Sequence, residues 1–402
     1  MAAALEPHGP ADRSNWARIW ILVLAGVVCA MQIGKVPPAL SLLREDLSVG
    51  LVASAWILSM FSALGALFGS AAGALADRFG SQHVTVASLL VMALASAVGG
   101  AAHGAELLLF SRAVEGSGFV VTVVAVPSLL VAAAADRARR FVPSLWGTYM
   151  PVGMALALAA SPLILSAAGW RLWWELNAAL LAALALAVAW SNSRVHQVRS
   201  RRSTQFGGML RASLLRPGVL LLAGIFASYA FQFLSIMGFL PTILQERGIA
   251  PRAAGGLTAL AVIVNAGGNL TAGWLVTRGV APRTLICTAM IGMVGAELVV
   301  FSPSYSASLQ YLAAVGFSAI GGLVPASIFT AVPDVAPAEA RSTTMGIVVQ
   351  ASHIGQLVGP PTVAAVAAAV GGWYASPLVL VPLAALGLAA ALSLNRRRWH
   401  SN

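Results

Sequence analysis

The sequence predicts an all-α integral membrane protein with twelve transmembrane helices in two six-helix pseudo-symmetric halves. Composition is the first observation behind this prediction, because 59% of the 402 residues are hydrophobic, 9% are charged and the mean hydropathy is +0.85. A water-soluble domain carries about 25% charged residues, since its surface must face water. The second observation is a series of apolar segments of membrane-spanning length, and the third is a motif that returns about 200 residues later.

The apolar segments fall into two groups of six, separated by the longest polar interval of the chain, Ser191 to Pro217. A helix of about 20 apolar residues crosses the hydrocarbon core of a bilayer. The segments are expected to form an N-terminal half at 18–191 and a C-terminal half at 217–395, with a central cytoplasmic loop at 192–216 and tails at 1–17 and 396–402. The predicted spans are 18–40, 51–75, 84–102, 106–133, 142–167, 172–191, 217–243, 254–276, 283–301, 307–332, 342–369 and 374–394.

The placement of basic residues predicts which side of the membrane each loop faces, because short cytoplasmic loops carry an excess of Lys and Arg. With the N-terminus inside, 18 of the 24 basic residues fall on the cytoplasmic side, and only Arg44, Arg171, Arg247 and Arg252 fall on the other. All but Lys35 are arginines, and alanine is abundant, which is typical of a GC-rich bacterial genome. We therefore expect a multi-pass protein of a bacterial inner (plasma) membrane, with both termini cytoplasmic.

Several classes of protein are excluded by the sequence. The charges lie in short clusters between apolar runs, which does not indicate a nucleic-acid-binding domain. The basic stretch from Arg194 to Arg216 is expected to lie on the headgroups of the lipid bilayer. No G-x-x-x-x-G-K-[ST], H-E-x-x-H or G-x-S-x-G motif of ATP-driven proteins or hydrolases occurs. Cys29 and Cys287 lie in separate apolar segments and predict neither a disulfide nor a metal site. We therefore expect that the protein is not an enzyme and that it binds neither a cofactor nor a metal.

Two stretches about 200 residues apart read alike, and each closes an apolar segment. They are AGALADRFG at 72–80 and AGWLVTRG at 272–279. Any tight cytoplasmic turn selects Gly, Asp and Arg, but the matching place in each half favours a duplicated six-helix unit.

The first stretch resembles the loop signature G-x-L-a-D-r-x-G-r-k of the major facilitator superfamily, with Ser81 and Gln82 in place of the last basic pair. RAVEGSG at 112–118 resembles that family's R-x-x-q-G-x-g pattern, and GWR at 169–171 resembles its turn into the sixth helix. The resemblance covers the whole chain. It implies a monomeric secondary active transporter that works by alternating access, with a small-molecule substrate held between the halves. It also implies a conformational latch at the cytoplasmic helix ends, formed by Gly73, Asp77, Arg78, Gly80 and Arg278.

The cargo is expected to be a small organic anion, carried with a proton as the coupling ion. The drug-antiporter signature g-x-x-x-G-P-x-x-G-G is only half present at 147–153, and a closer form, GQLVGPP, lies at 355–361. The chain looks more like cyanate-permease-like carriers of small anions. The alternative is proton-driven efflux of drugs, siderophores or other metabolites. A membrane sensor is disfavoured, because no interval is long enough for a reading domain.

Charged side chains inside the predicted spans are the first candidates for the substrate site, because an ionised group in lipid needs a partner, an aqueous cavity or a function. Lys35 and Arg112 are predicted to anchor the anion. The alternative for Lys35 is to snorkel to the outer interface or to pair with Glu45 or Asp46. Arg112 and Glu115 are three residues apart and share a helix face, so they can also form a self-neutralising pair.

Glu115 and His353 are the candidates for proton coupling, since histidine titrates near neutral pH. For His353 the alternative is a hydrogen bond to a neighbouring helix. Glu297, at the outer end of the ninth span, is expected to be solvated. The uncharged candidates for substrate binding, which can equally join neighbouring helices, are Tyr149, Tyr229, Gln232, Asn265, Asn269, Gln350 and Gln356, with Asn177 as a further possibility.

Overall fold

The structure is a computed structural model that describes residues 14–135, 142–191, 206–337 and 340–394, apart from the side chains at 73, 74, 76, 77, 143, 144, 206 and 342. The described residues form helices and turns, with no strand among them. Eleven helical stretches are long and apolar enough to cross a membrane. One of them, α9 (Tyr149–Trp190), has 42 residues and turns at Gly169, whose φ is 74°, so it crosses twice. The described chain therefore has twelve spans, as predicted.

The N-terminal half begins with α1 (Trp16–Gly34), which ends just before Pro37 and Pro38. These prolines form a short turn, η2 (Pro37–Ala39), that leads into α2 (Leu40–Asp46). The second span is broken into short pieces, α3 (Leu51–Ser59), η3 (Met60–Ser62), α4 (Ala63–Phe68), η4 (Gly69–Ala71) and α5 (Ala72–Phe79). The remaining spans are α6 (Ser81–Gly100), α7 (Ala105–Ala133), and α8 (Val142–Trp146) with the two parts of α9.

In the C-terminal half, α11 (Pro217–Glu246), α12 (Pro251–Thr277) and α13 (Pro282–Val300) each begin with a proline, whose missing N–H is not needed at a first helical position. The later spans are α14 (Ala307–Gly321) with α15 (Leu323–Val335), α16 (Arg341–Val370), and η7 (Trp373–Ala375) with α17 (Pro377–Ser393). The segment 192–216 is not entirely a loop, because it contains α10 (Phe206–Leu214). Of the predicted tails 1–17 and 396–402, only residues 14–17 are among those described.

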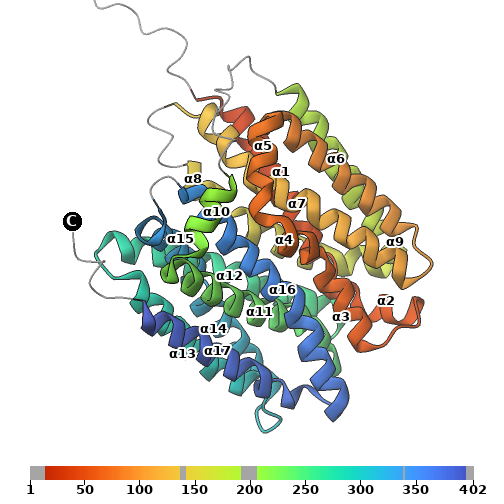
Figure 1. Ribbon diagram of the computed structural model, residues 1–402. Helices are drawn as coiled ribbons and strands as arrows, with labels where there is room; N and C mark the ends of the chain where they lie inside the picture. The colour runs from red at the N-terminus through yellow and green to blue at the C-terminus, as the bar shows by residue number, and fades with distance from the viewer. Residues whose placement is uncertain (1–13, 136–141, 192–205, 338–339, 395–402) are drawn as a thin grey trace, which may run out of the picture.

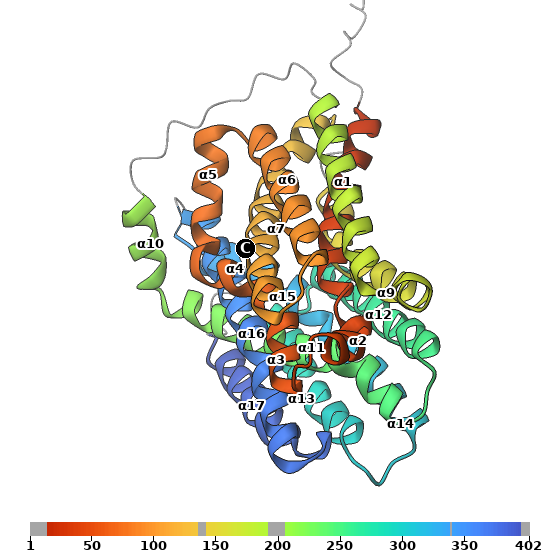
Figure 2. The same ribbon diagram turned by 90° about the vertical axis from the view of Figure 1, so that its right-hand side faces the viewer.

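The two halves form two bundles that lie side by side (Figures 1 and 2). The first bundle, α1–α9, is coloured red to yellow-green, and the second, α11–α17, is coloured green to blue. They meet where α9 packs on α12, where α16 packs on α3 and α4, and where η2 packs on α11. These contacts form the boundary between the two halves.

Glycines at matching places allow the same pair of helices to approach closely in each half. A Cβ atom on Gly153 would lie 2.2 Å from the carbonyl oxygen of Val27, where α9 crosses α1. A Cβ atom on Gly355 would lie 2.1 Å from the carbonyl oxygen of Ala227, where α16 crosses α11. Since a carbonyl oxygen cannot yield to a methyl group at this distance, both crossings require glycine.

The ends of the two halves also correspond. Trp170 Nε1 donates a hydrogen bond to Asp46 Oδ2 at 3.1 Å, and Trp373 Nε1 donates one to Glu246 Oε2 at 2.8 Å. Each residue lies about 200 positions from its counterpart. The internal repeat is therefore visible in side-chain contacts as well as in the loop motif.

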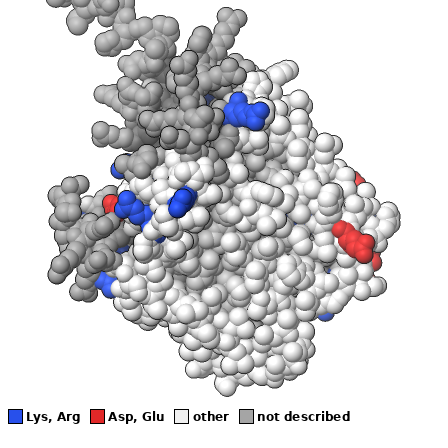
Figure 3. All heavy atoms as spheres, viewed as in Figure 1, with Lys and Arg blue, Asp and Glu red and all other residues white. Residues whose placement is uncertain are grey.

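Charged residues gather toward the two ends of the molecule. In Figure 3 basic residues appear mainly toward the upper left and acidic residues at the right, with an almost uncharged surface between them. An almost uncharged band of this kind suits the hydrocarbon core of a bilayer. Which end faces the cytoplasm stays a prediction from the placement of arginine.

Candidate functional site

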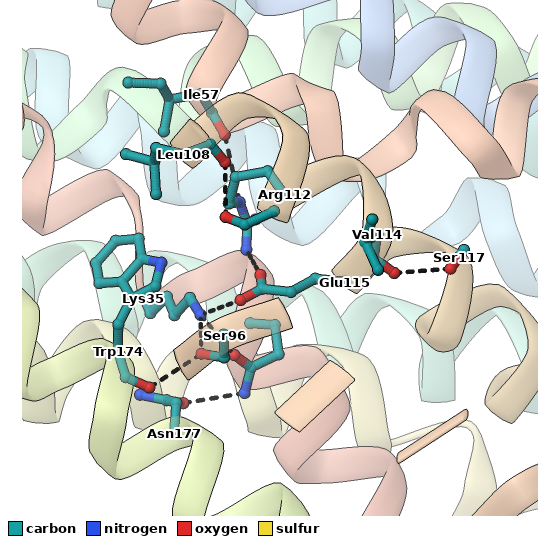
Figure 4. A network of polar contacts seen from close by, with 12 residues as sticks. Lys35, Ile57, Ser96, Leu108, Arg112, Val114, Glu115, Ser117, Trp174 and Asn177 are labelled. Atoms are coloured by element: carbon teal, nitrogen blue, oxygen red, sulfur yellow. Dashed lines mark hydrogen bonds and ion pairs between the residues drawn. The ribbon is translucent and has the colours of Figure 1, made fainter. Parts of the chain in front are cut away.

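The charged residues inside the N-terminal half meet in one buried cluster. Lys35 Nζ lies 2.7 Å from Glu115 Oε1, and Arg112 Nη1 bonds to Glu115 Oε2. All three side chains are 0% exposed. Figure 4 shows Lys35 and Arg112 converging on the Glu115 carboxylate. The pairing of Arg112 with Glu115 is confirmed, and with all three groups ionised this charge cluster holds one more positive than negative charge.

The Lys35 ammonium uses all of its three N–H donors. They are directed to Glu115 Oε1 at 2.7 Å, Gln32 Oε1 at 2.8 Å and Ser96 Oγ at 2.8 Å. The ring of Trp174 adds a cation–π contact, with Nζ 4.6 Å from its centroid. The two alternatives for Lys35, snorkelling and pairing with Glu45 or Asp46, are therefore wrong.

Uncharged residues from α1 itself and from two other helices, α6 and α9, fix the position of Lys35. Gln32 Nε2 donates to Asn177 Oδ1 at 3.0 Å, and Ser96 Oγ donates to the carbonyl oxygen of Trp174 at 2.9 Å. The sequence analysis considered Asn177 as a residue that can join neighbouring helices, but it missed Gln32, Ser96 and Trp174. Isolated polar residues on apolar helices look alike in a sequence. The 200-residue offset of the repeat was the available signal, because it pairs Gln32 with Gln232.

Arg112 differs from Lys35 in having a free donor. Its guanidinium lies over the ring of Phe61, 4.7 Å from the centroid, and its Nε donates to the carbonyl oxygen of Ile57 at 3.4 Å. Its Nη2 is buried and has no hydrogen-bond partner among the described residues. Since a buried unpaired donor is costly, this nitrogen is a candidate contact for a ligand.

Aromatic side chains connect Arg112 with the other half of the molecule. The ring of Phe61 lies 5.1 Å from that of Phe119, which lies 6.2 Å edge-on from the ring of His353 on α16. Tyr149 lies 6.4 Å from Phe119 and stacks on Trp146 at 4.4 Å. The charge cluster thus borders an aromatic surface that extends to the boundary between the halves.

The three candidate residues of α16, Gln350, His353 and Gln356, face the second span of the N-terminal half. Gln356 Oε1 accepts from Ser62 Oγ at 2.9 Å, and Gln350 Nε2 donates to the carbonyl oxygen of Ala66 at 2.8 Å. The His353 ring occupies the space beside Gly65, where a Cβ atom would lie 2.7 Å from His353 Cγ. We call this contact between α16 and residues 62–70 the α16 seam. Gln350, His353 and Gln356 thus belong to the α16 seam and not to the charge cluster. His353 Nδ1 has no partner among the described residues.

The candidates of the C-terminal half form a third group. Asn265 Nδ2 donates to Tyr229 Oη at 3.1 Å and to the carbonyl oxygen of Ser318 at 2.8 Å, and Asn269 Nδ2 donates to Asn265 Oδ1 at 3.0 Å. Gln232 Nε2 donates to the carbonyl oxygen of Ser228 at 3.0 Å. Asn265 therefore joins α12 to α11 and α14, whereas Asn269 and Gln232 donate within their own helices, and none of these hydrogen bonds reaches the charge cluster.

Glu297 contradicts the expectation from the sequence. It lies one turn from the end of α13, and a side chain at that place was expected to reach water. Instead it is 0% exposed, and neither carboxylate oxygen has a hydrogen-bond partner among the described residues. The prediction of a solvated Glu297 is wrong, because the neighbouring helices extend far enough to cover it.

The expected latch is described only in part. Gly80 adopts a φ of 85° between α5 and α6, which explains the glycine of the motif. Arg78 lies over the ring of Phe79 at 5.2 Å, and Arg278 lies over that of Trp274 at 3.9 Å. The surroundings of Gly73 and Asp77 lie outside the part of the chain that the structure describes, so the latch stays a prediction.

Comparison with known proteins connects this site to a family. The model of the Major Facilitator Superfamily matches residues 22–360 and 220–402. The chain is 26% identical over 320 residues to the 3-(3-hydroxy-phenyl)propionate transporter of Escherichia coli (strain K12), covering 79% of this chain and 77% of that protein.

Two other relatives match over shorter stretches. The chain is 28% identical over 170 residues to the niacin transporter NiaP of Acinetobacter baylyi, covering 40% of this chain and 37% of that protein. It is 28% identical over 182 residues to a methylenomycin A resistance protein of Bacillus subtilis, covering 45% of this chain and 39% of that protein. The chain thus spans well under half the length of either relative.

Solved structures share the fold. A bacterial homolog of the human lysosomal transporter Spinster, in an inward-facing and occupied conformation, superposes with a TM-score of 0.73 at 16% identity over 93% of this chain and 94% of that one. The unoccupied inward-facing structure gives a TM-score of 0.75 at 15% identity, over 96% and 95%.

Proposed function

Since the chain belongs to the Major Facilitator Superfamily and its curated relatives are membrane transporters, we propose that it is a secondary active carrier of small organic anions, and of aromatic carboxylates in particular. The observation that carries this proposal is the Arg112 guanidinium, which lies on the Phe61 ring with Nη2 buried and unpartnered. A guanidinium N–H donates a charge-assisted hydrogen bond to a carboxylate, and Nη2 is the nitrogen of Arg112 that is free to do so. The substrate ring then packs against Phe61 and Phe119.

The relatives support the same class of cargo. The name of the Escherichia coli transporter specifies 3-(3-hydroxy-phenyl)propionate, which joins an aromatic ring to a carboxylate. An excess positive charge inside the membrane needs a compensating anion. The charge cluster has one excess positive charge, which one monovalent anion balances. Lys35 contributes its charge without a direct hydrogen bond to the substrate, because its three N–H donors are already used within the protein.

Glu115 is the proposed coupling group. It is the one carboxylate in the charge cluster and accepts from both cations. A proton on Glu115 removes its negative charge, so that the positive charges of Lys35 and Arg112 attract the substrate carboxylate. Proton and substrate then favour each other's binding, which by linkage corresponds to symport. His353 is the second candidate for the proton, because its Nδ1 lies unpartnered at the α16 seam.

Efflux of drugs, siderophores or other metabolites is the second candidate function. The observation in its favour is the match to a methylenomycin A resistance protein. An exporter of varied apolar compounds has no need of the buried Arg112 donor for recognition, so dependence on Arg112 distinguishes the two functions.

The test is ligand-induced thermal stabilisation of the detergent-purified protein, because a bound ligand raises the apparent melting temperature by mass action. The ligands are 3-phenylpropionate and its neutral amide. They differ in the charged carboxylate that Arg112 would bind. One variant is Arg112→Lys, which keeps the charge but loses the planar guanidinium. The other is Arg171→Lys, which changes an arginine outside the charge cluster that pairs with Asp46 at 2.8 Å.

We expect stabilisation by the carboxylate alone, its loss in Arg112→Lys and its retention in Arg171→Lys. Equal stabilisation by the amide, or an unchanged effect in Arg112→Lys, would contradict the proposed site. Stabilisation only by cationic amphiphiles would favour efflux. Uptake of 3-phenylpropionate into proteoliposomes should saturate and should respond to a pH gradient, whereas non-saturating conductance would exclude a carrier.

A further inference from the structure

The repeat gives a residue-by-residue correspondence between the interiors of the two halves. On α6 and α7, Met92 packs against Gly118, where a Cβ atom would lie 2.4 Å from Met92 Cγ. On α13 and α14, Met293 packs against Gly321, where a Cβ atom would lie 3.5 Å from Met293 Sδ. Met92 therefore corresponds to Met293, and Gly118 corresponds to Gly321.

The first helix of each half completes this layer. In the N-terminal half Cys29 Sγ lies 3.7 Å from Met92 Sδ. In the C-terminal half a Cβ atom on Gly321 would lie 3.2 Å from Tyr229 Cε2, so Tyr229 takes the place of Cys29. The two residues are 200 positions apart, the offset that also relates the two loop motifs.

One helical turn beyond this layer lie the three side chains that surround the Lys35 ammonium, since residues three or four apart share a helix face. They are Gln32, Ser96 and Glu115, whose oxygens lie 2.8, 2.8 and 2.7 Å from Nζ. The same step in the C-terminal half leads from Tyr229, Met293 and Gly321 to Gln232, Glu297 and Ser318. Each set contains one glutamine, one serine and one glutamate, with the serine and the glutamate exchanged between helices.

The acceptor atoms of the C-terminal set have no partner. Gln232 Oε1, Ser318 Oγ and both carboxylate oxygens of Glu297 are buried without a hydrogen bond to any described residue. All three side chains are 0% exposed. The position that corresponds to Lys35 is Ser235, whose hydroxyl donates to the carbonyl oxygen of Phe231 at 2.7 Å. The set thus has the oxygen atoms that hold an ammonium group in the other half, but not the lysine.

Among the described residues, no basic side chain pairs with Glu297. The helices α14, α15 and α17, which pack on α13, contain no Lys, Arg or His, and neither does α11. Arg283 on α13 donates instead to the carbonyl oxygens of Ala391 and Leu392 at 3.1 and 2.6 Å, and Tyr311 donates to that of Leu257 at 3.0 Å. The other titratable groups on α11–α15 and α17 are Tyr229, Glu246, Arg252, Cys287 and Asp334, and no hydrogen bond joins any of them to Glu297.

We propose that Gln232, Glu297 and Ser318 form a binding site for a small monovalent cation, Na⁺ or H⁺, at the place where the N-terminal half carries the Lys35 ammonium. A buried carboxylate without a counter-charge is too costly to persist in an apolar interior. A cation on Glu297 removes this cost, and the amide and hydroxyl oxygens complete its coordination or accept the proton's hydrogen bond. One carboxylate balances a single positive charge, which favours a monovalent over a divalent ion. The site lies in the opposite half from Arg112 and does not depend on the proposed anion cargo.

The test is cation-dependent stability of the purified full-length protein without any organic substrate. The apparent melting temperature is measured while Na⁺ replaces choline at constant chloride, and separately while the pH is lowered without Na⁺. Binding of the cation by the native state alone gives a saturable rise of a few degrees. The variants are Glu297→Gln, which keeps the shape and loses the charge, and Glu246→Gln, a matched control that removes a carboxylate bonded to Trp373 elsewhere.

A Na⁺ site gives a rise with Na⁺ at fixed pH that Glu297→Gln lacks. A proton site gives a rise on acidification that Glu297→Gln lacks, without an effect of Na⁺. In both cases Glu246→Gln behaves like the wild type. Ser235→Lys supplies an ammonium at the position of Lys35 and should also abolish the response while keeping the protein folded. The proposal is overturned if the wild type responds to neither cation, or if Glu297→Gln keeps the wild-type response.

Discussion

The ammonium group of Lys35 lies 2.7 Å from the carboxylate of Glu115, although 80 residues separate them in the sequence. Glu115 also accepts from Arg112, so one anion holds two cations together inside the N-terminal half. The stability of this half and its affinity for an anion therefore depend on the same carboxylate.

Neutralising Glu115 should destabilise the protein more than neutralising Lys35. Glu115→Gln leaves two buried cations without an anion, whereas Lys35→Met leaves the balanced pair of Arg112 and Glu115. Removing one partner of a buried ion pair costs about 3–5 kcal/mol. The apparent melting temperature should be lowest for Glu115→Gln and should partly recover in the double variant with Lys35→Met. Equal melting temperatures for the two single variants would contradict this balance of charge.

The spans and the Arg112–Glu115 pair could be predicted from the sequence, because both depend on local patterns. Apolar runs of bilayer length are continuous in the sequence, and residues three apart share a helix face by helix geometry alone. The pairing of Lys35 with Glu115 could not be predicted, since it depends on how α1 and α7 pack. Two acids near Lys35 in the sequence, Glu45 and Asp46, offered partners that the fold does not bring together with it.

Glu297 was expected to reach water because it lies near a helix end. Distance from a helix end is, however, a poor guide to burial. Whether a residue one turn from the end of α13 reaches water depends on α14 and α17, which no local pattern describes. Its correspondence with Ser96 was nevertheless within reach of sequence reasoning. The repeat pairs α6 with α13, and counting from their first residues, Ser81 and Pro282, brings Ser96 and Glu297 into register.

Alanine at Gly355 should be far more damaging than alanine at Gly224 on the neighbouring helix. A Cβ atom at position 355 would lie 2.1 Å from the carbonyl oxygen of Ala227, whereas a Cβ atom at position 224 would have no neighbour within 4 Å. Overpacking costs about 1–3 kcal/mol, and an unhindered Gly→Ala change in a helix gains about 1 kcal/mol. The measurement is the apparent melting temperature in detergent. If both variants matched the wild type, the close crossing of α11 and α16 would be wrong.

Asn265 and Asn269 lie on one face of α12 but should differ in their effect on stability. Asn265 donates to Tyr229 and to Ser318 on other helices, whereas Asn269 donates only to Asn265 on its own helix. A hydrogen bond between membrane helices contributes about 0.6 kcal/mol, and at most about 1.7. Asn265→Ala should therefore lower the melting temperature by more than Asn269→Ala. Loss of 3-phenylpropionate binding in Asn265→Ala at an unchanged melting temperature would instead make Asn265 a substrate contact.

A covalent link across the α16 seam should stop transport if the two halves separate there during the cycle. Ser70 and Gly346 suit a disulfide, because a Cβ atom on Gly346 would lie 3.7 Å from that of Ser70 and disulfides join Cβ atoms about 3.8 Å apart. In a protein with Cys29 and Cys287 replaced by alanine, oxidised Ser70→Cys/Gly346→Cys should lose uptake of 3-phenylpropionate into proteoliposomes and regain it on reduction.

The control for this experiment is a link inside one half. A Cβ atom on Gly218 would lie 3.1 Å from that of Val335, and both residues belong to the C-terminal half, on α11 and α15. Oxidised Gly218→Cys/Val335→Cys should therefore transport at the rate of its reduced form, because alternating access moves each half nearly as a rigid body. Full transport by the oxidised Ser70→Cys/Gly346→Cys protein would show that α16 and the second span stay together throughout the cycle. The moving boundary would then have to lie at the contacts of α9 with α12 and of η2 with α11.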